Sequence, residues 1–200
     1  MRLRRPHLSR VVQAFVRHVA QSLPEFSHLD AERILVVAGE ARRASRGSVK
    51  PLAFREAKRK DARGNEKPVV KVSGKRMLYC ITLRPLFFRG SSAAARIETV
   101  LHELFHISPR FDGTLHAGRR HAQLGLRFPK LLKPLVRRAI ADCPPEIYDV
   151  FSHEGEVRVW QWLERPPPKL SPGVRPRRLY TEEQLFVGVV RMTHRARQTV

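Results

Sequence analysis

The segment from Ile97 to His106 constrains the fold more than any other part of the sequence. Its apolar side chains recur at helical spacing and fall within an arc of about 140°, whereas two histidines and two carboxylates fill the opposite side. Pro109 follows, and a proline disfavours helical geometry at the residue before it. The pattern predicts an amphipathic helix that begins after Ser91 or Ser92, ends near His106 and presents a polar face.

Hydrophobic periodicity predicts further helices and strands along the chain. The expected helices cover 8–22 and 130–141, and the expected strands cover 33–38, 69–72, 77–83 and 156–163. For the run at 33–38, a helix that begins near Asp30 is the alternative. The runs 69–72 and 77–83 flank a Ser-Gly-Lys-Arg turn, so we expect an antiparallel hairpin there. Helices mixed with antiparallel strands indicate an α+β fold, with the 97–106 helix packed on a small antiparallel sheet.

The length of the chain fits one domain. Its 200 residues, 42% of them hydrophobic, are enough to bury a single core. We therefore expect one domain over 1–200, with its core at about 30–163. A proline-rich brace is expected at 165–180, and a Thr181-Glu-Glu-Gln184 capping box is expected to open a last helix at 181–198.

Two histidines four positions apart carry the most specific chemical signal. His102 and His106 project from one helix face, one turn apart, so their imidazoles can hold one zinc ion. Glu103 stands beside them and can act as general base toward a metal-activated water. Glu98, one turn earlier, can orient the ring of His102. These residue types at this spacing predict a zinc-dependent peptidase in which Glu103 is the catalytic base.

A catalytic zinc site needs a third protein ligand and keeps a fourth position open. The Phe111-Asp-Gly113 turn is expected to send the chain back toward the metal. His116 and His121 are the available third ligands, with His116 favoured. The alternative is a ligand from elsewhere in the chain, for which the candidates are His153, Glu154 and Glu156.

The segment His102-Glu-Leu-Phe-His-Ile-Ser-Pro-Arg-Phe-Asp-Gly113 resembles the core of a family of predicted bacterial zinc metallopeptidases. The likeness covers about residues 30–125. More distantly, the arrangement is similar to SprT-like and Spartan zincins. These resemblances imply a compact minigluzincin-like fold, zinc held by His102, His106 and a later histidine, and Glu103 as the base. SprT-like proteins often carry a cysteine zinc ribbon, which two cysteines cannot supply.

The chain is strongly basic, which suggests a second class of partner. Lys and Arg number 39 against 18 acidic residues, for a formal net charge of +21. A polyanion such as nucleic acid is the obvious partner for such a charge. The arginines are nevertheless dispersed along the chain, so the binding could be non-specific. The alternative function is therefore a basic nucleic-acid-associated protein, either a DNA-associated protease or an inactive zincin that binds a partner.

Cellular location is predicted from what the sequence lacks. No apolar run reaches the length of a membrane span. The N-terminus starts basic and turns apolar, but Arg17 and His18 interrupt the apolar stretch, unlike in a signal peptide. Cys80 and Cys143 form no Cys-x-x-Cys motif, which favours a reducing compartment. We expect a cytoplasmic protein that acts on a protein or peptide substrate.

Overall fold

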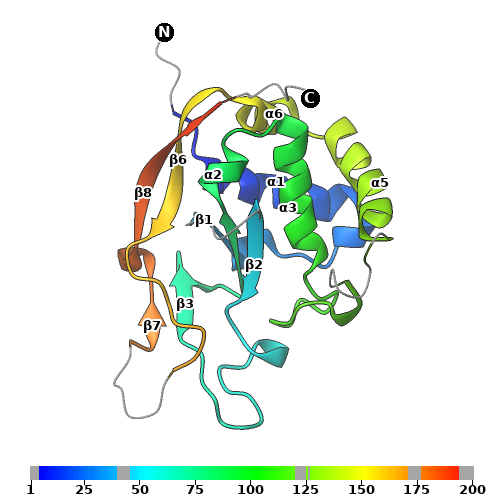
Figure 1. The fold of residues 1–200 in the computed structure, drawn as a ribbon. Helices are drawn as coiled ribbons and strands as arrows, with labels where there is room; N and C mark the ends of the chain where they lie inside the picture. The colour runs from blue at the N-terminus through cyan, green and yellow to red at the C-terminus, as the bar shows by residue number, and fades with distance from the viewer. Residues whose placement is uncertain (1–4, 40–45, 120–124, 126, 171–176, 194–200) are drawn as a thin grey trace.

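A mixed five-stranded sheet forms the centre of the computed structural model, which describes residues 5–39, 46–119, 125, 127–170 and 177–193 (Figure 1). Its strand order is β2-β5-β1-β6-β8, and a smaller sheet has the order β4-β3-β7. The central strands are β1 (Ile34–Ala38), β2 (Gly47–Pro51), β5 (Tyr79–Leu83), β6 (Gly155–Trp162) and β8 (Leu185–Met192). The small sheet consists of β3 (Val69–Val72), β4 (Lys75–Arg76) and β7 (Leu179–Tyr180).

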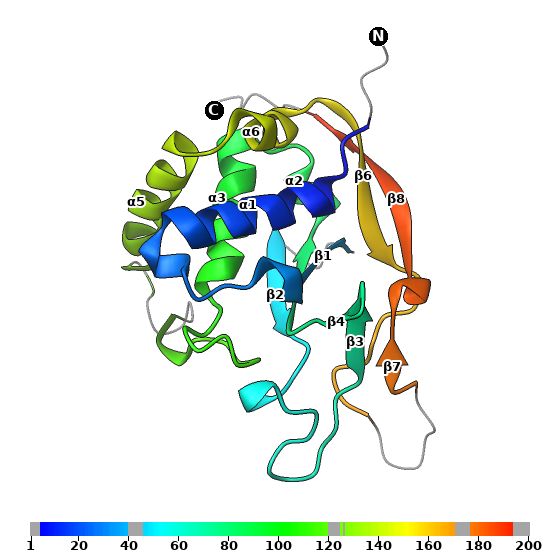
Figure 2. The same ribbon diagram turned by 180° about the vertical axis from the view of Figure 1, so that it is seen from behind.

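Helices cover one face of the central sheet (Figures 1 and 2). They are α1 (Leu8–Ser22), α2 (Pro85–Phe88), α3 (Ala93–Phe105), α5 (Arg127–Ala141) and α6 (Pro145–Ser152). Short 3-10 turns are η1 (Pro24–Phe26), η2 (Ala31–Arg33), η3 (Arg55–Ala57), η4 (Ala117–Arg119) and η5 (Glu182–Gln184). The main core lies between these helices and the sheet, and a second, smaller core lies on the other face, beneath the small sheet.

The two cores explain the residue pattern of β1. All five of its residues are buried, because Ile34 and Val36 face the main core while Leu35 and Val37 face the second core. A strand covered on both faces reads as a continuous apolar run. The expected strands at 33–38 and 156–163 and the expected helices at 8–22 and 130–141 are confirmed with small shifts of their ends. Pro134 lies inside α5.

The predicted hairpin is only partly correct. β3 pairs antiparallel with β4 across Ser73 and Gly74, both of which have positive φ. The chain then leaves the small sheet, and the backbone N–H of Leu78 donates to the carbonyl of Arg33 at 2.8 Å. β5 therefore joins the central sheet, parallel to β1 and antiparallel to β2, so the sheet is mixed and not antiparallel throughout.

The predicted C-terminal helix over 181–198 is wrong. The capping box forms as expected between Thr181 and Gln184, but it opens only the short turn η5. The following Leu-Phe-Val-Gly-Val-Val run forms β8, which pairs along its whole length with β6. Its β-branched residues and an available partner strand outweigh the helix-start signal. The last part of the predicted helix, 194–198, lies outside the described residues.

The α+β fold class is confirmed. No helix within the described ranges is long and apolar enough to span a membrane. Cys80 is buried, Cys143 is partly buried, and both are free thiols.

Candidate metal centre

α3 carries the candidate site at its C-terminal end. Ser92 caps the helix by accepting a hydrogen bond from the backbone N–H of Ala95, at 3.3 Å. Four apolar side chains of α3 are fully buried against the sheet and the other helices: Ile97, Val100, Leu101 and Leu104. The helix ends at Phe105 and His106 is the C-cap residue. The amphipathic helix predicted from the sequence is therefore present with the expected ends.

His102 and His106 lie together on α3. Their ring centroids are 5.0 Å apart and both side chains are partly exposed. Nδ1 of His106 lies 2.8 Å from the backbone carbonyl oxygen of Arg119. A carbonyl can only accept, so Nδ1 carries the proton and Nε2 carries the lone pair. This is the tautomer and the type of supporting bond found for histidines that ligate metals.

The chain returns to His106 after the helix, as the turn at 111–113 predicts. The N–H of Ser108 donates to the carbonyl of Thr114 at 3.1 Å, and the N–H of His116 donates to the carbonyl of His106 at 2.8 Å. Ile107 and Leu115 form an antiparallel bridge between these two contacts. The loop is therefore a closed hairpin-like connection that brings residue 116 next to the end of α3.

Tyr79 fixes this loop to the central sheet. Its buried hydroxyl donates to the carbonyl of Thr114 and accepts from the N–H of Gly113, both at 2.9 Å. Burial raises the pKa of Tyr79 to about 12. Gly113 has φ +87°, and an added Cβ would lie 2.7 Å from the carbonyl oxygen of Phe54. Only glycine fits this position, which explains the Asp-Gly pair in the sequence.

Glu103 lies against the edge strand β2 and not in open solvent. The residue is 7% exposed. Burial raises the pKa of Glu103 to about 7, although a hydrogen bond from the Val49 backbone and the positive charge of Arg84 both act to lower it. A carboxyl group with a pKa near neutrality is suited to accept and return a proton. The electrostatics of Glu103 therefore match those of a general base.

Phe128 at the start of α5 covers both imidazoles. The centroid of its ring lies 4.7 Å from that of His102 and 5.2 Å from that of His106, and Phe128 itself is buried. The sequence pattern does not single out this residue. No local signal marks it, because its contact with α3 depends on the packing of two helices.

The candidate third ligands have different positions. His116 is partly exposed, and its Nδ1 is buried without a hydrogen-bond partner among the described residues. Burial lowers the pKa of His116, and the charge of Arg119 lowers it further. His121 lies outside the described residues. Within the described part of the chain, no three His, Cys, Asp or Glu side chains are grouped so that they could hold a metal ion.

The other candidates for the third metal ligand come from a later part of the chain. His153, Glu154 and Glu156 follow α6, where the carbonyl of His153 accepts a hydrogen bond from Arg96 near the start of α3. Glu156 forms an ion pair with Arg5 at 2.7 Å. Glu98 is exposed on α3.

His28 lies close to His116 and Arg119 in the structure. His28 was not among the candidate site residues predicted from the sequence. Its Nε2 atom is buried with no hydrogen-bond partner in the described structure. Burial lowers the pKa of His28, and the charges of Arg119 and His116 act in the same direction. His28 follows η1, far from α3 in the sequence, so only the tertiary fold brings it close to His116.

Comparison with known families agrees with the geometry. A family model described as "Putative phage metallopeptidase" matches residues 4–131, from the segment before α1 to the first turn of α5. No significant match was found among curated proteins or among solved structures. A metallopeptidase requires a metal cofactor, and the matched region contains the whole of α3 and the loop that follows it. The match covers more than half of the chain, so the chain belongs to the family that this model describes.

Proposed function

We propose that this protein is a zinc-dependent peptidase. Its active site would lie at the C-terminal end of α3 and hydrolyse peptide bonds of a substrate. The observation that carries the proposal is the pairing of two adjacent imidazoles with a buried carboxyl group on one helix turn. His102 and His106 would hold the metal. Imidazole nitrogens are donors that suit zinc. When bound, zinc supplies Lewis acidity that lowers the pKa of water toward about 7.

Glu103 performs the proton transfers. Its carboxylate takes a proton from the attacking water and returns it to the leaving amine. The strand β2 beside it is an edge strand of the central sheet, and Val49 of that strand contacts the carboxyl group of Glu103. An extended peptide can add main-chain hydrogen bonds to such an edge. This neighbourhood favours a peptide or protein substrate, in a cytoplasmic setting consistent with free thiols.

His116 is the third ligand that we favour over His121. Its buried Nδ1 lacks a hydrogen-bond partner among the described residues, and its backbone is bonded to His106. Because no three His, Cys, Asp or Glu side chains are grouped as a metal site among the described residues, ligation by His116 requires a local rearrangement. Replacing His116 with Ala should then remove most of the bound zinc, whereas His121→Ala should retain it. The reverse pattern would make His121 the ligand.

The decisive experiment separates metal binding from catalysis. Wild-type protein purified without chelators should carry about one zinc per chain by elemental analysis. Glu103→Gln should keep that zinc and lose cleavage of an unstructured protein such as casein. His102→Ala and His106→Ala should lose both. A wild-type protein free of zinc, or a Glu103→Gln variant that cleaves normally, would rule out this function.

A further inference from the structure

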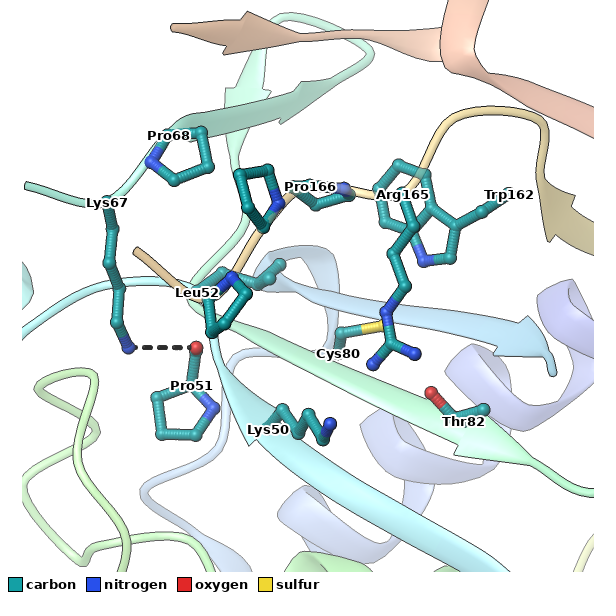
Figure 3. A pocket seen from close by; sticks show the side chains of 12 residues that line it. Lys50, Pro51, Leu52, Lys67, Pro68, Cys80, Thr82, Trp162, Arg165 and Pro166 are labelled. Atoms are coloured by element: carbon teal, nitrogen blue, oxygen red, sulfur yellow. Dashed lines mark hydrogen bonds between the residues drawn. The ribbon is translucent and has the colours of Figure 1, made fainter. Parts of the chain in front are cut away.

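A groove crosses the face of the central sheet opposite to α3. It consists of two adjoining pockets of about 550 Å³ and about 530 Å³. Both pockets are lined by Lys50, Thr82, Trp162 and Arg165, which define what we call the basic groove. β2 and β5 form its floor, and the proline-rich segment 165–168 forms a wall (Figure 3). Each pocket has the size of a typical small-ligand site.

The lining of the basic groove carries positive charge without any carboxylate. Among the described residues that line it are Lys50, Lys67, Arg84 and Arg165, and none is Asp or Glu. Lys67 lines one end of the groove, where its amine donates to the carbonyl of Pro51 at 3.1 Å (Figure 3). The same amine donates to the carbonyl of Ala53 at 3.1 Å. Lys50 and Arg165 are exposed where the two pockets meet. The centre of the groove therefore attracts an anion.

The same place offers a stacking surface. Trp162 ends β6 and is only partly buried, with its ring beside the wall segment (Figure 3). Ser48 at one end adds a hydroxyl group that can donate to a phosphate oxygen. A cationic groove with an aromatic ring is the usual arrangement for binding single-stranded nucleic acid. An acidic peptide would satisfy the charges but would leave the ring without a base to stack on.

We propose that the basic groove binds single-stranded nucleic acid, with phosphates near Lys50 and Arg165 and a base stacked on Trp162. The formal net charge of +21 adds a long-range attraction for the same polyanion. This proposal goes beyond the peptidase function and does not depend on it. Successive side chains of β2 point to opposite faces, so Val49 packs into the main core while Lys50 lines the groove.

The first test uses the fluorescence of Trp162. The chain has two tryptophans, so Trp160→Phe leaves Trp162 as the only reporter. Titration with a short oligothymidylate at about 0.15 M salt should quench its emission saturably. A duplex of the same sequence and polyglutamate should bind more weakly and should not quench. Absence of quenching by the single strand, or equal quenching and affinity with polyglutamate, would overturn the proposal.

The second test compares two variants with the same change in charge. Lys50→Gln with Arg165→Gln should weaken oligothymidylate binding and reduce the salt slope by about 0.7 for each phosphate that the variant no longer neutralises. Lys133→Gln with Arg137→Gln, two exposed residues on α5, is the matched control and should retain the wild-type slope. Equal reductions in the two variants would mean that binding is spread over the surface and would overturn the assignment to the groove.

The third test removes the ring. Trp162→Leu keeps an apolar side chain against the second core but should weaken binding about 5- to 150-fold. Fluorescence anisotropy of a labelled oligothymidylate measures the affinity, and thermal unfolding identifies any variant that fails to fold. Glu103→Gln should bind the oligonucleotide like wild type, so failure of the peptidase proposal and failure of this one are distinguishable. Unchanged affinity in a folded Trp162→Leu protein contradicts the stacking role.

Discussion

Gly47 of β2 packs directly against Glu103 of α3. A Cβ atom added to Gly47 would lie 3.3 Å from both Cγ and Oε1 of Glu103 and 3.2 Å from Cγ2 of Thr99. These separations are tighter than ordinary van der Waals contact. The edge strand therefore approaches the carboxyl group as closely as it does because this residue has no side chain.

Gly47→Ala should displace Glu103 and lower kcat while leaving the zinc content unchanged. A misplacement approaching 1 Å costs up to about 100-fold in rate, so a shift of a few tenths of an ångström should cost less. Gly90→Ala is the control, because the nearest atom to its added Cβ is 4.0 Å away, on Thr193. Steady-state cleavage of a fluorogenic peptide measures both variants. A Gly47→Ala enzyme with full activity would show that Glu103 does not depend on this contact.

The buried carboxyl group of Glu103 should make the metal-free protein less stable as the pH rises. The pKa of Glu103 is raised from 4.5 to about 7, so the folded state holds the proton more tightly than the unfolded chain. This contribution is fully present below about pH 4.5 and is lost as the pH rises through about 7, with a total of about 3 kcal/mol.

A comparison with Glu103→Gln isolates this effect, because two partly exposed histidines act in the opposite direction. Burial lowers the pKa of His28 and of His116, so these groups destabilise the fold at low pH. Urea unfolding of chelator-treated wild type and Glu103→Gln between pH 4.5 and 8 provides the comparison. The difference in unfolding free energy between the two proteins should decline with pH, and a constant difference would contradict the raised pKa.

Phe128 should stabilise both the fold and the metal site. Phe128→Ala removes a buried ring at a cost of about 3–5 kcal/mol and leaves His102 and His106 without the surface that they pack on. Leu132→Ala, one turn later on α5 and also buried, should destabilise the fold by about 2–5 kcal/mol but should leave zinc affinity unchanged. Zinc competition with a chromophoric chelator measures the difference. Equal zinc affinities in the two variants would limit Phe128 to a packing role.

Arg96 should be essential for stability although it is not one of the proposed site residues. Its fully buried guanidinium donates to five backbone carbonyls, those of Phe88, Arg89, Phe151, His153 and Thr193. Arg96→Met removes all five hydrogen bonds from a fully buried position and should lower the free energy of unfolding by at least about 3 kcal/mol. The exposed Arg137→Met on α5 should change it by less than about 0.5 kcal/mol. Chemical denaturation measures both, and a small effect at Arg96 would mean that water replaces the guanidinium.

Local sequence was sufficient to predict α3 and to place the candidate site residues on it. The 3.6-residue period that buries Ile97 and Leu104 also places His102 and His106 on one side, and the Ser92 cap and Pro109 limit the helix at its two ends. These effects are set by residues within a few positions of one another. The return of the chain at 111–113 was predictable for the same reason.

The partners that come from distant segments depend on the tertiary fold. β8 forms a strand because β6 is available to pair with it, which overrides a correct local helix-start signal at Thr181. The burial of Glu103 against β2, the Phe128 ring over the histidines and the basic groove all join segments that are far apart in the sequence. Short-range patterns contain no information on which faces meet, because packing is set by the three-dimensional arrangement of whole elements.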